Sequence, residues 1–100
     1  MPLGVLSPRD IEMQHQLEQQ ANFDALTGLA NRHLLMDRAQ QSLINARRNH
    51  TLMAVALVDL DNFKLINDTL GHEMGDRLLV QMAARLHECV RGNDTVARYG

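Results

Sequence analysis

Hydrophobic and polar residues follow two kinds of pattern along this chain. Apolar residues recur at helical spacing in three segments, about residues 7–22, 32–48 and 75–90, and the last has the widest apolar stripe. Two shorter runs, residues 52–58 and 95–99, are rich in β-branched and aliphatic residues and predict strands. The order helix, helix, strand, helix, strand is typical of an α/β domain, in which we expect the first strand to be buried on both faces.

Polar residues mark where the predicted helices begin. Ser7 and Asp10 form a capping-box arrangement around Pro8, and Asn31 can cap the second helix. The helix at residues 7–22 has a narrow apolar stripe, formed by Met13, Leu17 and Ala21. This pattern fits either a linker helix that pairs with its own copy in a dimer or a solvated helix that rests on the domain.

Composition narrows the class of protein. One hundred residues make one small domain, and an apolar fraction of 45% is ordinary for a globular chain. The net charge is −2, without a long basic run, so nothing supports nucleic-acid binding through a broad positive surface. Cys89 is the single cysteine, and its apolar helical surroundings predict a buried structural thiol.

Targeting signals are not evident in the sequence. Its longest apolar stretch is too short to span a membrane, and its first residues lack the basic and apolar regions of a signal peptide. We expect a cytoplasmic location, either as a free protein or as the cytoplasmic part of a membrane-bound sensor.

Two carboxylates follow the first predicted strand directly. Asp59 and Asp61 lie two residues apart, so on a strand both side chains would share a face. Oxygen ligands at such a strand end suit Mg²⁺ or Mn²⁺. The plainer interpretation, a pair of solvated acids, is equally compatible with the D-x-D pattern alone.

A longer string is more specific. Residues 59–76 read D-x-D-x-F-K-x-I-N-D-x-x-G-H-x-x-G-D, and residues 24–32 read D-x-L-T-G-L-x-N-R. Together, in this order and spacing, the two motifs resemble the GGDEF family of diguanylate cyclase domains. The resemblance covers about residues 22–100, with Gly100 matching the first glycine of the signature Gly-Gly-(Asp/Glu)-Glu-Phe turn.

The resemblance implies a fold and a division of the chain. It implies an α/β fold, more specifically an α+β sandwich of the nucleotide-cyclase and polymerase-palm type. Such a domain has a ferredoxin-like central sheet with flanking helices, and this chain would contain a truncated form of it. Residues 1–22 would form a linker or signalling helix and residues 23–100 a partial GGDEF domain. The strand that follows the signature turn would lie between the two predicted strands.

The same resemblance implies roles for residues around the acids. Asp59 and the Leu60 carbonyl would hold the catalytic cations, with Asp61 bracing the site, and Arg98 would face phosphate in the transition state. Asn67 and Asp76 would read the guanine base, since a carboxylate accepts from both N1–H and N2–H of guanine. Local helix capping is the alternative role for these two residues.

Further residues would contact phosphate, bind product or support the fold. The backbone N–H groups of Asn62 and Phe63 would bind phosphate. The Lys64 side chain would also contact phosphate, although it equally fits a solvated surface position. Product would be gripped by Arg91 and Asp94, which otherwise form an ordinary surface pair. Structural roles fall to Thr27, Gly28, Asn31, Arg32, Gly71, His72 and Gly75.

The implied activity is condensation of two GTP molecules into cyclic di-GMP with release of pyrophosphate. It would require Mg²⁺ or Mn²⁺, a homodimer and an upstream sensory domain, and it would be inhibited by product. The alternatives are a degenerate domain that serves as a receptor for GTP or cyclic di-GMP or as a dimerisation module, and an α/β domain that binds no nucleotide. These 100 residues alone are expected to be inactive.

Overall fold

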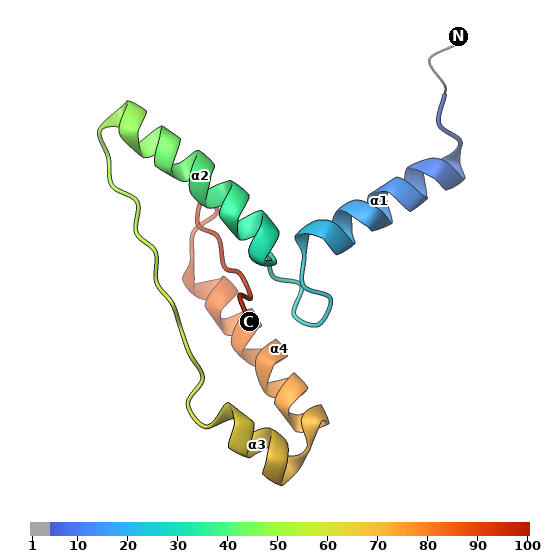
Figure 1. Ribbon diagram of the computed structural model, residues 1–100, viewed down its shortest axis with the longest axis vertical. Helices are drawn as coiled ribbons and strands as arrows, with labels where there is room; N and C mark the ends of the chain where they lie inside the picture. Colours follow the sequence, from blue (N-terminus) through green and yellow to red (C-terminus); the bar gives the residue numbers. More distant parts are fainter. Residues whose placement is uncertain (1–4) are drawn as a thin grey trace.

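The first helix projects away from the rest of the chain. The computed structural model describes residues 5–100, so the first four residues of the predicted linker segment 1–22 lie outside the described residues. Helix α1 covers Pro8–Asn22 and extends outward at the upper right of Figure 1. Ser7 caps α1, because its Oγ accepts a hydrogen bond from the Asp10 N–H at 3.2 Å. The predicted start of this helix is confirmed.

Helix α2 covers Arg32–Asn49, close to the predicted range. Asn31 caps it as expected, since its Oδ1 accepts from the Leu34 N–H at 3.0 Å. The helix ends at His50, which adopts a left-handed conformation with φ of 54°. Two arginines in the last turn, Arg47 and Arg48, stabilise the helix through their interaction with the negative end of its dipole.

Helices α3 and α4 form a tight hairpin. Helix α3 covers Phe63–Leu70 and α4 covers His72–Cys89, so Gly71 alone connects them. Gly71 has φ of 91°, a conformation that only glycine adopts readily, and it therefore provides the chain reversal. The predicted start of the last helix at Gly75 or Asp76 is wrong, because the break occurs at Gly71 and the helix continues through Gly75.

The segment expected to be a doubly buried strand is extended but solvent-exposed. It follows α2 and runs to α3 along the side of the molecule in Figure 1. Leu52 is 99% exposed and Leu57 is 84% exposed. The predicted strand at residues 52–58 is not formed among the described residues. Backbone N–H and C=O groups of a strand need a neighbouring strand, and within the described part of the chain none lies beside this segment.

The second expected strand forms one isolated bridge. In place of a strand at residues 95–99, Ala97 pairs in parallel with Ala30, and the Arg98 N–H donates to the Ala30 carbonyl at 2.9 Å. Ala30 also pairs with Phe23 on its other side. The C-terminal segment thus lies against the start of α2, although no sheet is formed within residues 5–100.

The described residues bury little apolar surface. The fully buried hydrophobic residues among them are three alanines, Ala30, Ala46 and Ala83. The radius of gyration is 17.8 Å, whereas a compact chain of 100 residues has about 13 Å, so the arrangement is open. Cys89 is exposed, which corrects the expectation of a buried thiol. Phe63 and Ile66 are half-buried on α3, which packs against α4.

Membrane-spanning segments are not found in the described helices. None of the helices between residues 5 and 100 has both the length and the hydrophobicity that a transmembrane helix requires.

Candidate active site

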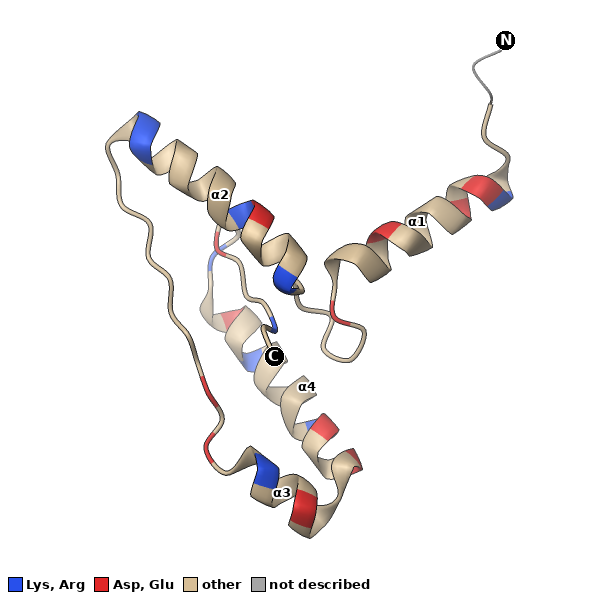
Figure 2. Ribbon diagram, in the orientation of Figure 1, with Lys and Arg blue, Asp and Glu red and all other residues tan. Residues whose placement is uncertain are grey.

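The two predicted metal-binding carboxylates lie where the extended segment meets α3. Figure 2 shows the acidic residues on the extended chain just before this helix. Asp59 and Asp61 are exposed, and Leu60 between them is half-buried. Asp59 lies at the end of the extended segment and Asp61 in the turn before α3, and both are accessible to a ligand at the N-terminal side of the helix.

The first turn of α3 presents unused backbone donors. Asn62 precedes the helix with φ of 59° and its side chain makes no capping hydrogen bond. The first backbone bond of the helix runs from the Ile66 N–H to the Asn62 carbonyl at 3.1 Å, so the N–H groups of Phe63 and Lys64 lie ahead of it. The positive end of the helix dipole therefore adjoins the acids, and the Lys64 side chain beside it is exposed.

The donor chemistry at this position fits a magnesium ion that is shared with a phosphate. The available ligands are the carboxylates of Asp59 and Asp61 and the carbonyl of Leu60, all oxygen. No cluster of three or more potential metal-binding side chains is present in the described residues. Mg²⁺ commonly takes one or two carboxylates and completes its octahedron with water and substrate phosphate, so a set this small is sufficient for it.

The two predicted base-reading residues lie on the two helices of the hairpin, Asn67 on α3 and Asp76 on α4. Asn67 is half-buried on α3, and its side chain lies against the α4 backbone at Gly75, the residue before Asp76. Asp76 is inside α4 and cannot be its N-cap, and the Asn67 side chain caps neither helix. The capping alternative is therefore excluded for both residues. His72 is the exposed first residue of α4.

The D-x-L-T-G-L-x-N-R motif, residues 24–32, forms a hydrogen-bond network between α1 and α2. Asp24 Oδ2 accepts from both the Thr27 hydroxyl at 2.8 Å and the Thr27 N–H at 2.9 Å. Gly28 completes this turn with φ of 73°, and its N–H donates to the Asp24 carbonyl. Asn31 reaches back to donate to the Ala21 carbonyl at 2.8 Å. The motif thus fixes the exit of α1 to the start of α2.

Arg98 connects this hydrogen-bond network to the C-terminal segment. Its Nη1 lies 3.3 Å from Asp24 Oδ2, an ion pair that joins residues 74 positions apart. Arg32 makes a parallel connection, since its Nη2 donates to the Tyr99 carbonyl at 2.9 Å and its guanidinium lies 4.0 Å above the Tyr99 ring. The sequence analysis missed the Asp24–Arg98 pair, and the phosphate contact of Arg98 stays a prediction.

The ionisation of Asp24 reflects these contacts. Partial burial alone would raise the pKa of this carboxyl group. The two hydrogen bonds from Thr27 and the positive charge of Arg98 outweigh that effect and hold the pKa of Asp24 below its ordinary value. Asp24 is therefore ionised at neutral pH.

The predicted product-binding pair forms an exposed turn after α4. The Arg91 N–H donates to Asp94 Oδ2 at 3.1 Å, and the Asp94 N–H donates to the Arg91 carbonyl at 2.9 Å. Within residues 5–100 the Arg91 guanidinium has no ion-pair partner. The turn thus leaves this cation free for an external anion.

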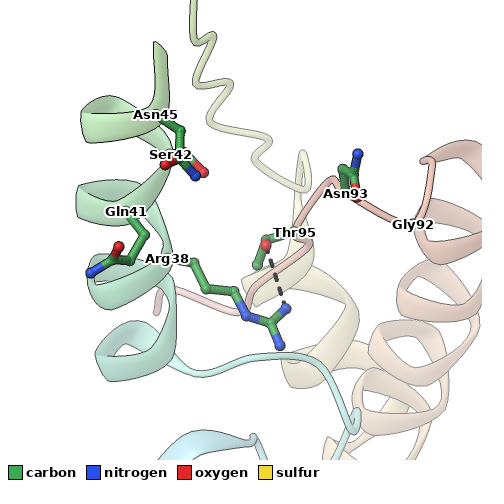
Figure 3. Close-up of a pocket in the computed structure, with 7 residues that line it drawn as sticks. All are labelled: Arg38, Gln41, Ser42, Asn45, Gly92, Asn93 and Thr95. Atoms are coloured by element: carbon green, nitrogen blue, oxygen red, sulfur yellow. Dashed lines mark hydrogen bonds between the residues drawn. The ribbon is translucent and has the colours of Figure 1, made fainter. Parts of the chain in front are cut away.

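A polar cavity of about 250 Å³ adjoins this turn. Figure 3 shows the side chains of α2 on one side and the turn on the other, with Arg38 Nη1 lying 3.4 Å from Thr95 Oγ1. The lining residues are Arg38, Gln41, Ser42, Asn45, Gly92, Asn93 and Thr95. The sequence analysis did not predict this cavity. The signal was the polar spacing along α2, but that spacing does not identify which distant loop faces it.

Comparison with known proteins decides the family. The family model described as "Diguanylate cyclase, GGDEF domain" matches residues 21–100. The chain belongs to the GGDEF family. This membership confirms the resemblance carried by the two motifs, and several relatives of this GGDEF chain are named diguanylate cyclases.

Two curated relatives illustrate how such segments occur in larger proteins. The GGDEF chain is 44% identical over 97 residues to the bifunctional diguanylate cyclase/cyclic di-GMP phosphodiesterase MucR of Pseudomonas aeruginosa, covering 97% of this chain and 14% of MucR. It is 40% identical over 88 residues to the cyclic di-GMP phosphodiesterase PdeB of Shewanella oneidensis, covering 88% of this chain and 10% of PdeB. The matched segment is thus a small part of each.

A solved structure supports the fold. The coiled coil and GGDEF domain of DgcB from Caulobacter crescentus, in complex with cyclic di-GMP, matches with a TM-score of 0.85 at 34% identity. The match covers 92% of this GGDEF chain and 48% of the DgcB chain. The chain therefore spans about half the length of that structure. The arrangement of its helices is that of a GGDEF domain.

The Asp24–Arg98 pair yields a stability prediction. In a protein that carries a complete GGDEF domain, Asp24→Asn is expected to lower the free energy of unfolding by about 1–2 kcal/mol, because it weakens charged hydrogen bonds in a partly exposed site. Urea unfolding at neutral pH measures this difference. Asp37 is an exposed acid on α2 outside this hydrogen-bond network, so Asp37→Asn is the matched control and should change the free energy of unfolding little.

The same pair predicts a pH dependence. The pKa of Asp24 is lowered in the folded state, so the ionised carboxylate stabilises the fold above the unfolded value of about 3.9. The stability difference between the native protein and Asp24→Asn should be constant above about pH 5 and shrink as the pH falls below about 4. A difference that persists undiminished at the lowest pH would contradict the role of the carboxylate charge.

Proposed function

We propose that this chain is part of a diguanylate cyclase domain that condenses two GTP molecules into cyclic di-GMP and two pyrophosphates. The active unit would be the complete domain, meaning this segment continued through the signature turn and the rest of a GGDEF domain. Two such domains would meet face to face, each holding one GTP.

The observation that carries this proposal is the arrangement around α3. Two carboxylates and the free N-terminal N–H groups of the helix lie at one end, which suits a metal-bound triphosphate. Asn67 lies four residues after Phe63, about 6 Å along the helix axis, and its side chain rests on Gly75, the residue before Asp76. One short helix thus offers donors for phosphate at its start and groups for a base near its end.

The residues would divide the work of the reaction. Asp59 and the Leu60 carbonyl would hold Mg²⁺ or Mn²⁺, and the Asp61 carboxylate would brace that site. The ion, when bound, neutralises phosphate charge and lowers the pKa of the attacking hydroxyl. Backbone N–H groups of Asn62 and Phe63, together with the Lys64 ammonium group, would orient the triphosphate. The 3′-oxygen of one nucleotide forms a bond to the α-phosphorus of the other, and pyrophosphate leaves with the electrons of the broken P–O bond.

Guanine selectivity would come from Asn67 and Asp76. The Asp76 carboxylate is exposed and accepts hydrogen bonds only, which matches the N1–H and N2–H donors of guanine. Adenine has no matching pair of donors, so it would leave the carboxylate unpaired.

Product inhibition is proposed for the turn after α4. The free guanidinium of Arg91 suits a phosphate group of cyclic di-GMP, and Asp94 suits its guanine base. Arg98 would contact phosphate in the transition state only after leaving Asp24, since its Nη1 is engaged there.

The proposed assembly is a homodimer controlled through α1 by an upstream sensory domain in the cytoplasm. Ile11, Met13 and Leu17 of α1 are 54%, 56% and 61% exposed, as expected for a helix whose apolar side awaits a partner. The matched DgcB structure includes a coiled coil. In the complete domain, residues 52–58 and 95–99 would join a central sheet on either side of the strand that follows the signature turn.

The test is an assay of the complete domain with GTP and Mg²⁺. Liquid chromatography of the reaction should show cyclic di-GMP and pyrophosphate accumulating in proportion to GTP consumed. Absence of product at any concentration of protein, GTP or metal would refute the cyclase proposal.

A second function is favoured by one comparison. The relative PdeB, 40% identical in this segment, is named a phosphodiesterase. A domain of this kind that binds GTP or cyclic di-GMP without forming product would be a receptor module in such a protein. Nucleotide binding by calorimetry in the absence of turnover would establish that alternative.

A further inference from the structure

Gly75 is an unusual residue for the interior of a long helix. It lies in the first turns of α4 and is buried, whereas its neighbours Met74 and Asp76 are exposed. Glycine is among the poorest helix formers, because it loses the most backbone entropy and adds no side-chain contact. Gly71 already provides the chain reversal of the hairpin, so Gly75 is not required for the turn.

The space that a side chain would take at Gly75 is occupied by Asn67. A Cβ atom built on Gly75 would lie 2.8 Å from Cγ of Asn67 and would overlap its Oδ1. Backbone hydrogen bonds keep the two residues in register, since the Gly71 N–H donates to the Asn67 carbonyl at 2.9 Å and the Gly75 N–H donates to the Gly71 carbonyl at 3.2 Å. The carboxamide therefore rests directly on the backbone of α4.

The Asn67 carboxamide is held by packing and not by hydrogen bonds. Its side chain makes no hydrogen bond to any other residue between 5 and 100, although it is half-buried. Its Oδ1 packs against Gly75, and the two N–H donors of its Nδ2 make no hydrogen bond within the described residues. The carboxamide rests on Gly75, the residue directly before Asp76, whose side chain is exposed.

We propose that Gly75 is the positioning residue for guanine recognition, seating the Asn67 carboxamide beside Asp76 so that the two side chains read one base edge together. This inference rests on the proposed function and adds a specificity determinant to it. A methyl group at Gly75 displaces the carboxamide from Asp76 and leaves Asp59 and the N-terminus of α3 in place. Base recognition is lost while phosphate chemistry is retained.

The test is Gly75→Ala in the complete domain, assayed with GTP and Mg²⁺. KM for GTP is expected to rise about tenfold, the loss of about one hydrogen bond to the base, while kcat stays within about twofold. Asn67→Ala should raise KM to a similar extent. Met74→Ala, an exposed neighbour on the same turn of α4, is the matched control and should leave both constants unchanged.

The double variant Asn67→Ala/Gly75→Ala distinguishes positioning from general damage to the helix. Without the carboxamide the added methyl has room, so the double variant should have the KM of Asn67→Ala and a thermal midpoint no lower than that variant. This comparison also serves if Gly75→Ala alone proves too unstable to assay. Additive losses in the double variant would overturn the inference.

The inference and the proposed function fail in different ways. If the native domain binds GTP and forms product but Gly75→Ala keeps the native KM, or loses kcat with KM unchanged, the positioning role alone is overturned. If the native domain neither binds GTP nor forms product, both are overturned.

Discussion

Replacing Asp59 by alanine is expected to reduce cyclic di-GMP formation by the complete domain by about a thousandfold or more. Asp59 is the first of the two carboxylates that precede α3 in the sequence. It is exposed near the helix end where the triphosphate is proposed to lie. Removing it takes away the anionic ligand of a cation that neutralises phosphate charge, and single electrostatic groups of this kind are worth about 10²–10³ in rate or more. Product formation at saturating GTP and Mg²⁺ is the measurement.

The controls for Asp59 separate metal binding from folding. Asp37→Ala removes an exposed acid on α2 and should keep the native rate. Raising the Mn²⁺ or Mg²⁺ concentration should partly restore Asp59→Asn, which retains a weak oxygen ligand, but not Asp59→Ala. A native rate in Asp59→Ala would rule out the assignment of this residue to the metal.

The second large effect concerns the 100-residue chain by itself, which is expected to lack a cooperative thermal transition and to self-associate. Its buried hydrophobic residues among positions 5–100 are three alanines, and burial of so little apolar surface cannot offset the conformational entropy of ordering the chain. The extended segment also exposes unpaired backbone and apolar side chains, including Val55 at 77% and Val58 at 62% exposure. Circular dichroism on heating and sedimentation velocity at several concentrations are the measurements.

A matched variant tests the cause of self-association. The double variant Val55→Lys/Leu57→Lys places charge on the exposed segment and should shift the sedimentation profile toward monomer. Gln40→Lys and Gln81→Lys add the same charge at exposed polar positions of α2 and α4 and control for net charge. A sharp, concentration-independent melt of the native 100-residue chain as a monomer would contradict this expectation.

Local signals in the sequence predicted the helices and several of their ends. Ser7 and Asn31 cap α1 and α2 as expected, because a cap depends on side chains within three residues of the helix start. The predicted start of α4 at about residue 75 is wrong, because the helix begins at His72. The backbone at Gly71 reverses the chain, whereas Gly75 is a packing requirement that is visible only when α3 lies beside α4.

The long-range features could not be predicted from local sequence. A strand is stabilised by its neighbours, and the composition of residues 52–58 says nothing about which partner is present. The Asp24–Arg98 pair joins residues 74 positions apart, and the cavity beside Arg38 depends on how α2 faces a distant turn. The motifs allow roles to be proposed for the candidate site residues, whereas the seating of Asn67 on Gly75 is visible only in the three-dimensional arrangement.

The backbone of Ala30 joins three parts of the chain at one point. It pairs with Phe23 at the exit of α1 on one side and with Ala97 near the C-terminal segment on the other, and its exposed fraction is 4%. We expect a twist applied along α1 to reach the residues before Gly100 through Ala30, together with the Asp24–Arg98 and Arg32–Tyr99 contacts beside it. Mechanical input at the N-terminus would arrive at the far end of the chain without first deforming α3 or α4.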